Sequence, residues 1–189
     1  QRHLDRCLTC GSCGTTCPSG VQYARLADIG RKIVEDRVGR PPAEAALRWS
    51  LRKGLTSRAL FGGAVALGRL AKELVPREFG RRIPSSRAPG VWPAPRHARR
   101  VIALEGCVQP SIAPATDAAL ARVLDRVGVS LVRAGGGGCC GARPFHLNDP
   151  EEARMYARRN IDAWWPEIER GAEAVVVSAS GCGVMVKDY

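Results

Sequence analysis

The stretch Cys7-Leu-Thr-Cys10-Gly-Ser-Cys13-Gly-Thr-Thr-Cys17-Pro18 decides the fold of the first part of this 189-residue chain. Its cysteines follow the pattern C-x2-C-x2-C-x3-C-P, which binds iron–sulfur clusters. Three thiolates at this spacing wrap around one cluster, because each turn of the loop directs a sulfur and the neighbouring amides to the same centre. A zinc knuckle and a disulfide scaffold are the alternatives for clustered cysteines. The spacing predicts an iron–sulfur loop.

The last cysteine of the run has a different expected role from the first three. In bacterial two-cluster ferredoxins, the cysteine that precedes proline ligates the other cluster. We therefore expect Cys7, Cys10 and Cys13 to bind one [4Fe–4S] cluster and Cys17 to serve another.

The overall composition is that of an ordinary globular protein, with 45% hydrophobic and 25% charged residues. No apolar run approaches the roughly 20 residues that cross a bilayer, and no secretory signal is visible, although the sequence also lacks an initiator Met. Clustered cysteines without such a signal favour metal ligation in a reducing compartment over extracellular disulfides. We expect a cytoplasmic protein.

The net charge of +11 raises the question of nucleic-acid binding. The basic residues are spread along the whole chain and aromatic side chains for base stacking are few, so no nucleic-acid partner is expected. The densest basic cluster lies in a proline-rich stretch, which predicts a solvated linker; an acidic partner or anionic lipid headgroups are the alternatives. That cluster comprises Arg81, Arg82, Arg87, Arg96, Arg99 and Arg100.

Residues 81–98 are expected to connect two different regions, because prolines at 84, 89, 93 and 95 prevent a helix or a central strand. Residues 1–80 form the first region, a helical module around the cysteine loop. Apolar residues recur at helical spacing up to about Val38, again over 46–51, and from Ser57 to Leu74.

Residues 99–189 show a different pattern, in which short apolar strands alternate with helices. Strands are expected at 101–104, 129–132 and 174–178, and helices at 114–127 and 150–165. This alternation predicts right-handed βαβ units and a parallel sheet. The predicted fold class is thus α + α/β: a small helical module of bacterial-ferredoxin type, then a three-layer α/β module with a short parallel sheet.

Each strand of the second region is followed by cysteine, in the order Cys107, Cys139-Cys140 and Cys182. Because parallel strands end at one edge of a sheet, these residues are expected in loops at the same edge, where such folds place their sites. Adjacent glycines are expected to allow close backbone approach to a bound group; they are Gly106, Gly138, Gly141, Gly181 and Gly183. Two adjacent cysteines can ligate one tetrahedral zinc ion only with strained bond angles, so an iron–sulfur centre is favoured over zinc. A third interpretation is that these are buried cysteines without a bound metal.

The remaining sequence features give weaker evidence of a functional site. His146 is close enough in sequence to reach a metal, but a packing or capping role is favoured, and Trp164-Trp165 indicates packing rather than an electron path. Gly135–Gly138 lacks the Lys-Ser/Thr of a phosphate-binding loop. No nucleophile–base pair or dinucleotide motif is present, so no substrate catalysis is expected from this chain alone.

With both cysteine sets in place, the chain resembles the iron–sulfur subunits of bacterial glycolate oxidase (glycolate dehydrogenase). These belong to a wider family with ferredoxin motifs and CCG domains, which includes heterodisulfide reductase subunits. The resemblance is carried by Leu4–Cys10, Thr16–Tyr23, Asp28–Val34, Leu104–Pro110, Gly138–Ala142, His146–Asn148, Asn160–Glu169 and Ser178–Lys187.

The resemblance implies two ferredoxin motifs and two CCG modules per subunit, whereas this sequence has one of each. It therefore looks like the middle of a longer subunit, with residues 99–189 the first CCG module. The fourth ligand of the Cys7/Cys10/Cys13 cluster would lie in the other ferredoxin motif. Met185 stands where many CCG modules have a further cysteine.

The implied function is electron transfer from an FAD-binding 2-hydroxy acid dehydrogenase subunit to the respiratory quinone pool. The implied location is cytoplasmic, with peripheral contact at the inner face of the membrane. Two alternatives stay open: an electron-transfer subunit of a heterodisulfide reductase-like complex, and an assembly scaffold stabilised by zinc or a cluster.

Overall fold

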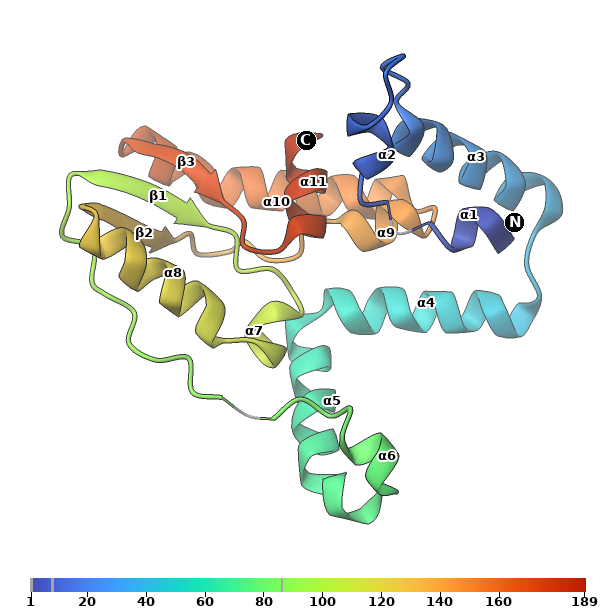
Figure 1. Ribbon diagram of the computed structural model, residues 1–189, viewed down its shortest axis with the longest axis horizontal. Coiled ribbons are helices and arrows are strands. Elements are labelled where there is room, and N and C mark those ends of the chain that lie inside the picture. The colour runs from blue at the N-terminus through green and yellow to red at the C-terminus, as the bar shows by residue number, and fades with distance from the viewer. Residues whose placement is uncertain (1, 8, 86) are drawn as a thin grey trace.

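The computed structural model describes residues 2–7, 9–85 and 87–189, and its first part is helical (Figure 1). The helices in this part are α1 (Arg2–Asp5), α2 (Ser12–Thr15), α3 (Tyr23–Val38), α4 (Pro42–Thr56), α5 (Arg58–Leu70), the 3-10 helix η1 (Ala71–Leu74) and α6 (Arg77–Gly80). Pro42 in the first turn of α4 and the Ser57 cap of α5 mark helix starts that the local sequence favours. The three predicted helices are confirmed, although α4 extends beyond the predicted 46–51 at both ends and the third ends in the 3-10 helix η1.

The apolar face of α3 is not buried within the chain, contrary to what its amphipathic pattern suggests. Leu26, Ile29 and Ile33 are each roughly half exposed. Periodicity identifies the face of a helix that is suited to burial, but only the surrounding elements decide whether something covers it.

The second part contains a parallel three-stranded sheet with strand order β2-β1-β3. Its strands are β1 (Arg99–Ala103), β2 (Val129–Arg133) and β3 (Ala172–Val176), and its helices are α7 (Gln109–Ile112), α8 (Ala115–Arg126), α9 (Ala142–His146), α10 (Pro150–Glu169) and α11 (Ser180–Lys187). Strand β3 begins two residues earlier than predicted, directly after the chain turns at Gly171, whose φ is +89°. Helix α10 continues past Pro166 and ends at Glu169, later than the predicted 165.

Alternating strand residues fill cores on both faces of the sheet. Val101 and Leu131 pack with Ala121 of α8 on one face, whereas Ile102 packs with Trp164 of α10 on the other. Both pairings of β1 are parallel. Helices therefore cover both faces, and the predicted α + α/β fold class with its three-layer second part is confirmed (Figure 1).

The stretch 81–98 contains neither helix nor strand in its described residues, but it is less free than a solvated linker. The Trp92 indole donates to the carbonyl of Leu131, 3.1 Å away. Arg81, Arg82 and Arg87 are exposed, as expected for solvated residues. The later arginines of the basic cluster also form ion pairs, although Arg96 and Arg99 remain exposed: Arg96 with Asp125, Arg99 with Glu173, and Arg100 with Glu167.

The two regions contact each other along α4. Arg52 of α4 is ion-paired with Asp149 and Glu152 at the start of α10, and Lys53 also reaches Glu152. Helix α5 then turns away from α4 and carries η1 and α6 at its far end (Figure 1). None of the helices in the described parts of the chain has the length and apolar character to span a membrane.

Candidate metal centres

The first cysteine run forms a short surface loop around α2. Cys7, Cys10 and Cys13 are exposed and Cys17 is half-buried. Gly11, with φ of +75°, occupies the left-handed region directly before α2 and lets the chain reverse between Cys10 and Cys13. The amide of Thr9 donates to the sulfur of Cys7 over 3.4 Å. A loop of this kind presents its thiols and amides outward, where a cluster can bind.

Hydrogen bonds within this loop favour the ligating thiolate state of two cysteines. The Ser12 hydroxyl and amide lower the pKa of Cys10 below its usual 9.0. The amides of Val21 and Ser19 likewise lower the pKa of Cys17. The thiolate is the form of cysteine that ligates metals, and these interactions favour it at both residues.

The loop is held to α3 by the buried side chain of Arg31. Its guanidinium donates to the carbonyl oxygens of Leu4 and Cys7, with a shortest distance of 2.8 Å to Cys7, and to the Thr9 hydroxyl at 3.2 Å. Sequence reasoning missed Arg31. A buried arginine near a cysteine loop is identifiable only from its contacts.

The second cysteine set lies at the carboxyl-terminal edge of the parallel sheet. Cys107 follows β1, and Cys139 and Cys140 follow β2. Cys182 follows β3 but lies in the first turn of α11, so the expectation of four loop cysteines was wrong at this position. The helix starts only four residues after the strand, which leaves too short a loop to contain Cys182.

The four thiols are close enough to change one another's acidity. Cys139 and Cys140 are 3% exposed, and hydrogen bonds from the Cys139 and Cys182 thiols lower the pKa of Cys140 to about 3. Hydrogen bonding with Cys139 lowers the pKa of Cys107 to about 7. The same interactions raise the pKa values of Cys139 and Cys182. Hydrogen bonding among these thiols therefore favours the thiolate form at Cys140 and Cys107 and the thiol form at Cys139 and Cys182.

Asn160 and Tyr189 fix the backbone of the cysteine pair, and sequence reasoning missed both. The fully buried Asn160 amide donates to the carbonyl of Cys139 at 2.9 Å and accepts from the Gly138 amide at 2.9 Å. The Tyr189 hydroxyl donates to the carbonyl of Cys140 at 2.7 Å. A buried asparagine must have such partners, and its place on the inner face of α10 is the signal that could have identified it.

Gly141 serves helix packing rather than an open space at the sulfur. Its φ is +81°, and a Cβ there would lie 2.8 Å from the carbonyl oxygen of Ala153. The glycine after the cysteine pair therefore lets the backbone of α10 approach the loop closely. The sequence pattern had suggested instead that this glycine makes room for a bound group.

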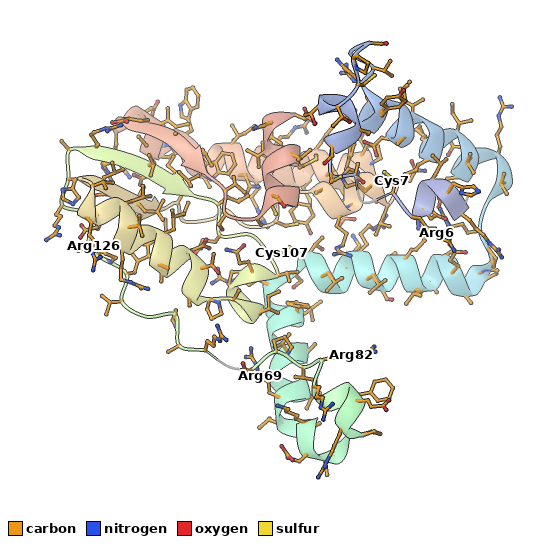
Figure 2. The ribbon with its side chains drawn as sticks, in the orientation of Figure 1. Arg6, Cys7, Arg69, Arg82, Cys107 and Arg126 are labelled. Carbon is orange, nitrogen blue, oxygen red and sulfur yellow. The ribbon has the colours of Figure 1, made fainter. Side chains whose placement is uncertain are left out.

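One cavity of about 730 Å³ joins the two cysteine sets. Cys7 and Thr9 of the first loop line it together with all four cysteines of the second set, Cys107, Cys139, Cys140 and Cys182. Figure 2 shows Cys7 and Cys107 near the middle of the molecule, where the two regions meet. Cys10, Cys13 and Cys17 do not line this cavity.

The donor set of this cavity fits an iron–sulfur centre. Soft thiolates are the preferred ligands of such clusters, and the amide of Gly141 donates to the Cys139 sulfur over 3.5 Å, as amides do to cluster sulfurs. Within residues 2–7, 9–85 and 87–189, no group of three or more His, Cys, Asp or Glu side chains is arranged to hold a single metal ion. The assignment of all eight cysteines as ligands stays a prediction.

The histidine and the tryptophan pair that the sequence analysis considered make contacts within the fold. His146 on α9 lies with Nδ1 3.2 Å from Oδ1 of Asp28 on α3, and its ring packs edge-on against Phe145. Trp164 is buried and stacks on Tyr189. Trp165 is largely exposed, with its indole donating to Glu169.

Comparison with known proteins shows which proteins this chain is similar to. Residues 101–187 match the CCG family, described as a cysteine-rich domain. The chain is 50% identical to the glycolate oxidase iron–sulfur subunit of Escherichia coli (strain K12), an alignment that covers all of this chain and 47% of that subunit. It is 25% identical to the probable glycolate oxidase iron–sulfur subunit of Bacillus subtilis (strain 168), covering all of the chain and 48% of the relative.

The chain thus spans about half the length of the curated relatives it matches. No solved structure matches it. The resemblance inferred from the two cysteine patterns is confirmed: the chain is similar along its full length to iron–sulfur subunits of glycolate oxidase, and its residues 101–187 match the CCG cysteine-rich domain.

Proposed function

We propose that this chain is the iron–sulfur electron-transfer part of a glycolate (2-hydroxy acid) dehydrogenase. It would relay electrons from an FAD-binding dehydrogenase subunit to the respiratory quinone pool. The observation that carries the proposal is the cavity shared by Cys7 of the ferredoxin-type loop and the four cysteines of the CCG domain. A cavity that contacts Cys7 and all four CCG cysteines suits electron transfer between two neighbouring metal centres.

In this proposal the four cysteines of the ferredoxin-type loop hold iron–sulfur clusters, which would supply one-electron transfer. Cys7, Cys10 and Cys13 hold one [4Fe–4S] cluster, with a fourth ligand from another ferredoxin motif, and Cys17 serves the cluster of that motif. Cys107, Cys139, Cys140 and Cys182 hold a further iron–sulfur centre or zinc. The other residues of this chain tune and shield these sites: Ser12 and the loop amides favour thiolates, and Asn160 fixes the loop of the cysteine pair.

We further propose three units within the chain: a helical module over 1–80, a connector over 81–98 and a CCG module over 99–189. All eight cysteines are free thiols, which suits a reducing compartment. We therefore propose a cytoplasmic location, with peripheral contact at the inner face of the membrane through the partner subunits. Substrate oxidation would take place on the flavin subunit.

The test is electron paramagnetic resonance with iron and sulfide quantitation on the full-length subunit, purified anaerobically. Rhombic signals in the reduced state and about eight irons would support two ferredoxin-type clusters. A further signal that disappears in Cys140→Ser, while the other signals persist, would place a centre at the CCG domain. Zinc in place of iron, with no paramagnetic cluster, would contradict electron transfer and leave a zinc-stabilised scaffold.

A further inference from the structure

Arg31 makes more contacts to the first cysteine loop than packing alone requires. Its side chain is 9% exposed, and three of its nitrogens donate to the loop, at the carbonyls of Leu4 and Cys7 and the hydroxyl of Thr9. A planar guanidinium offers five donors in a rigid fork, so a single side chain can fix several points of a loop at once. The backbone of Cys7 is thereby held in one place relative to α3.

Asp28 connects this anchor to the CCG domain. Its Oδ1 accepts from Nη1 of Arg31 at 2.9 Å, and the same oxygen lies 3.2 Å from Nδ1 of His146. His146 lines the cavity that contains Cys7 and the four CCG cysteines. A continuous series of polar contacts therefore runs from α9 of the CCG domain, through α3, to the backbone of Cys7.

We infer that Arg31 is a positioning residue that sets the geometry and the reduction potential of the cluster bound through Cys7. Asp28 and His146 link the position of Arg31 to the CCG domain through their polar contacts. The inference rests on the proposed cluster at Cys7 and goes beyond it by naming the residues that control it.

The electrostatic argument gives the direction of the effect. Reduction adds an electron, and a permanent positive charge beside the cluster favours the reduced state. Arg31 is such a charge, because guanidinium does not lose its proton in proteins, and it is shielded from water by burial. Asp28 offsets part of this charge. Loss of Arg31 should lower the potential, and loss of the Asp28 charge should raise it.

The experiment is a redox titration of the full-length subunit, followed by electron paramagnetic resonance, in Arg31→Gln and Arg31→Lys. Arg31→Gln should shift the midpoint of one cluster to more negative potential. Arg31→Lys keeps the charge and should stay closer to wild type, although its line shape should change because the fork is lost. Arg37→Gln is the matched control: it removes the same charge from an exposed position on the same helix and should shift nothing.

Two further variants test the link to the CCG domain and cover the case in which Arg31→Gln fails to assemble. Asp28→Asn should shift the midpoint to more positive potential. His146→Leu should alter the line shape of the Cys7 cluster, although His146 is 118 residues away from Asp28 in sequence. Iron and sulfide content, measured in parallel, separates the two claims: a wild type without clusters overturns the proposed function and this inference with it. Intact clusters with unchanged midpoints in Asp28→Asn and Arg31→Gln overturn this inference alone.

Discussion

The helical region and the CCG domain are stabilised in different ways. In the described residues, every buried hydrophobic side chain falls between Val101 and Trp164. The buried residues with side chains before position 99 are polar or charged: Thr9, Arg31 and Thr56. The CCG domain thus has an apolar core of its own, whereas the helical region is held by polar contacts.

The helical region contains a network of ion pairs around Arg40, whereas none of its described hydrophobic side chains is buried. The Arg40 side chain is 5% exposed and forms ion pairs with Asp5, Glu35 and Glu44. Burial of apolar surface is the main stabilising contribution in folded domains, so ion pairs that reach solvent give the helical region less stability. We expect it to unfold more readily than the CCG domain and to depend more on its ligands and neighbours.

The largest expected effect comes from the core of the CCG domain. Ile102 is 0% exposed at the centre of the sheet, so Ile102→Ala should lower the free energy of unfolding by about 2–5 kcal/mol. Leu26→Ala on the half-exposed face of α3 is the matched helical variant and should cost less than about 1 kcal/mol. Urea unfolding, followed by tryptophan fluorescence and far-ultraviolet circular dichroism, measures both. Equal losses would contradict the comparison.

Asn160 tests the polar part of the CCG domain. Asn160→Asp keeps the size of the side chain but cannot donate to the carbonyl of Cys139. A buried group left without its partner should cost about 1–3 kcal/mol, and the cysteine pair should react faster with a thiol reagent. Asn148→Asp, at a half-buried position before α10, is the control. A thiol reactivity equal to wild type in Asn160→Asp would show that the amide does not hold the loop.

Arg40 tests the charged network of the helical region. Arg40→Ala removes three ion pairs, but the carboxylates remain partly solvated, so a loss of about 1–2 kcal/mol is expected. Arg48→Ala removes only one pair with Asp5 and should have a smaller effect. Hydrogen exchange of the α3 and α4 amides localises the change. Faster exchange in the sheet instead would place the role of Arg40 outside the helical region.

The smallest expected effects concern acid stability. The hydrogen bond from Arg40 lowers the pKa of Asp5 below 3.8, and that from Arg96 lowers the pKa of Asp125 in the same way. A carboxyl group whose pKa falls on folding contributes stability above its unfolded pKa near 4 and loses it as the pH drops through the folded value. Asp5→Asn and Asp125→Asn should each flatten the loss of stability between pH 5 and pH 3, the first in the helical region and the second in the CCG domain. Urea midpoints across this range measure how stability depends on pH. An unchanged pH dependence in both variants would show that these carboxyl groups do not cause the loss of stability.

Several elements were predictable because their signals are local. The spacing of Leu26, Ile29 and Ile33 identified α3, and Pro42 marks the first turn of α4, because helix periodicity and proline restrictions act over a few residues. The alternation of strands and helices predicted the parallel sheet. From that sheet, the meeting of Cys107, Cys139, Cys140 and Cys182 followed, since parallel strands end at one edge.

Details that depend on packing between distant segments were missed. Cys182 was expected in a loop, but α11 begins directly after β3 and includes it. Gly141 was assigned to the bound group, whereas its neighbour is the backbone of α10. The ion pairs of Arg96, Arg99 and Arg100 were also missed, because the acidic residues that pair with them are distant in sequence.

The sequence by itself determined two features of this protein: its eight cysteines in two spacings, and the division into a helical region and a βαβ domain. Both are predictable because cysteine spacing and local periodicity are properties of neighbouring residues. Only the tertiary structure decided that Cys7 lines the same cavity as the CCG cysteines, that Arg31 holds the Cys7 loop, and that the apolar face of α3 stays uncovered within this chain. The reason is physical: burial and contact depend on how elements far apart in sequence come together.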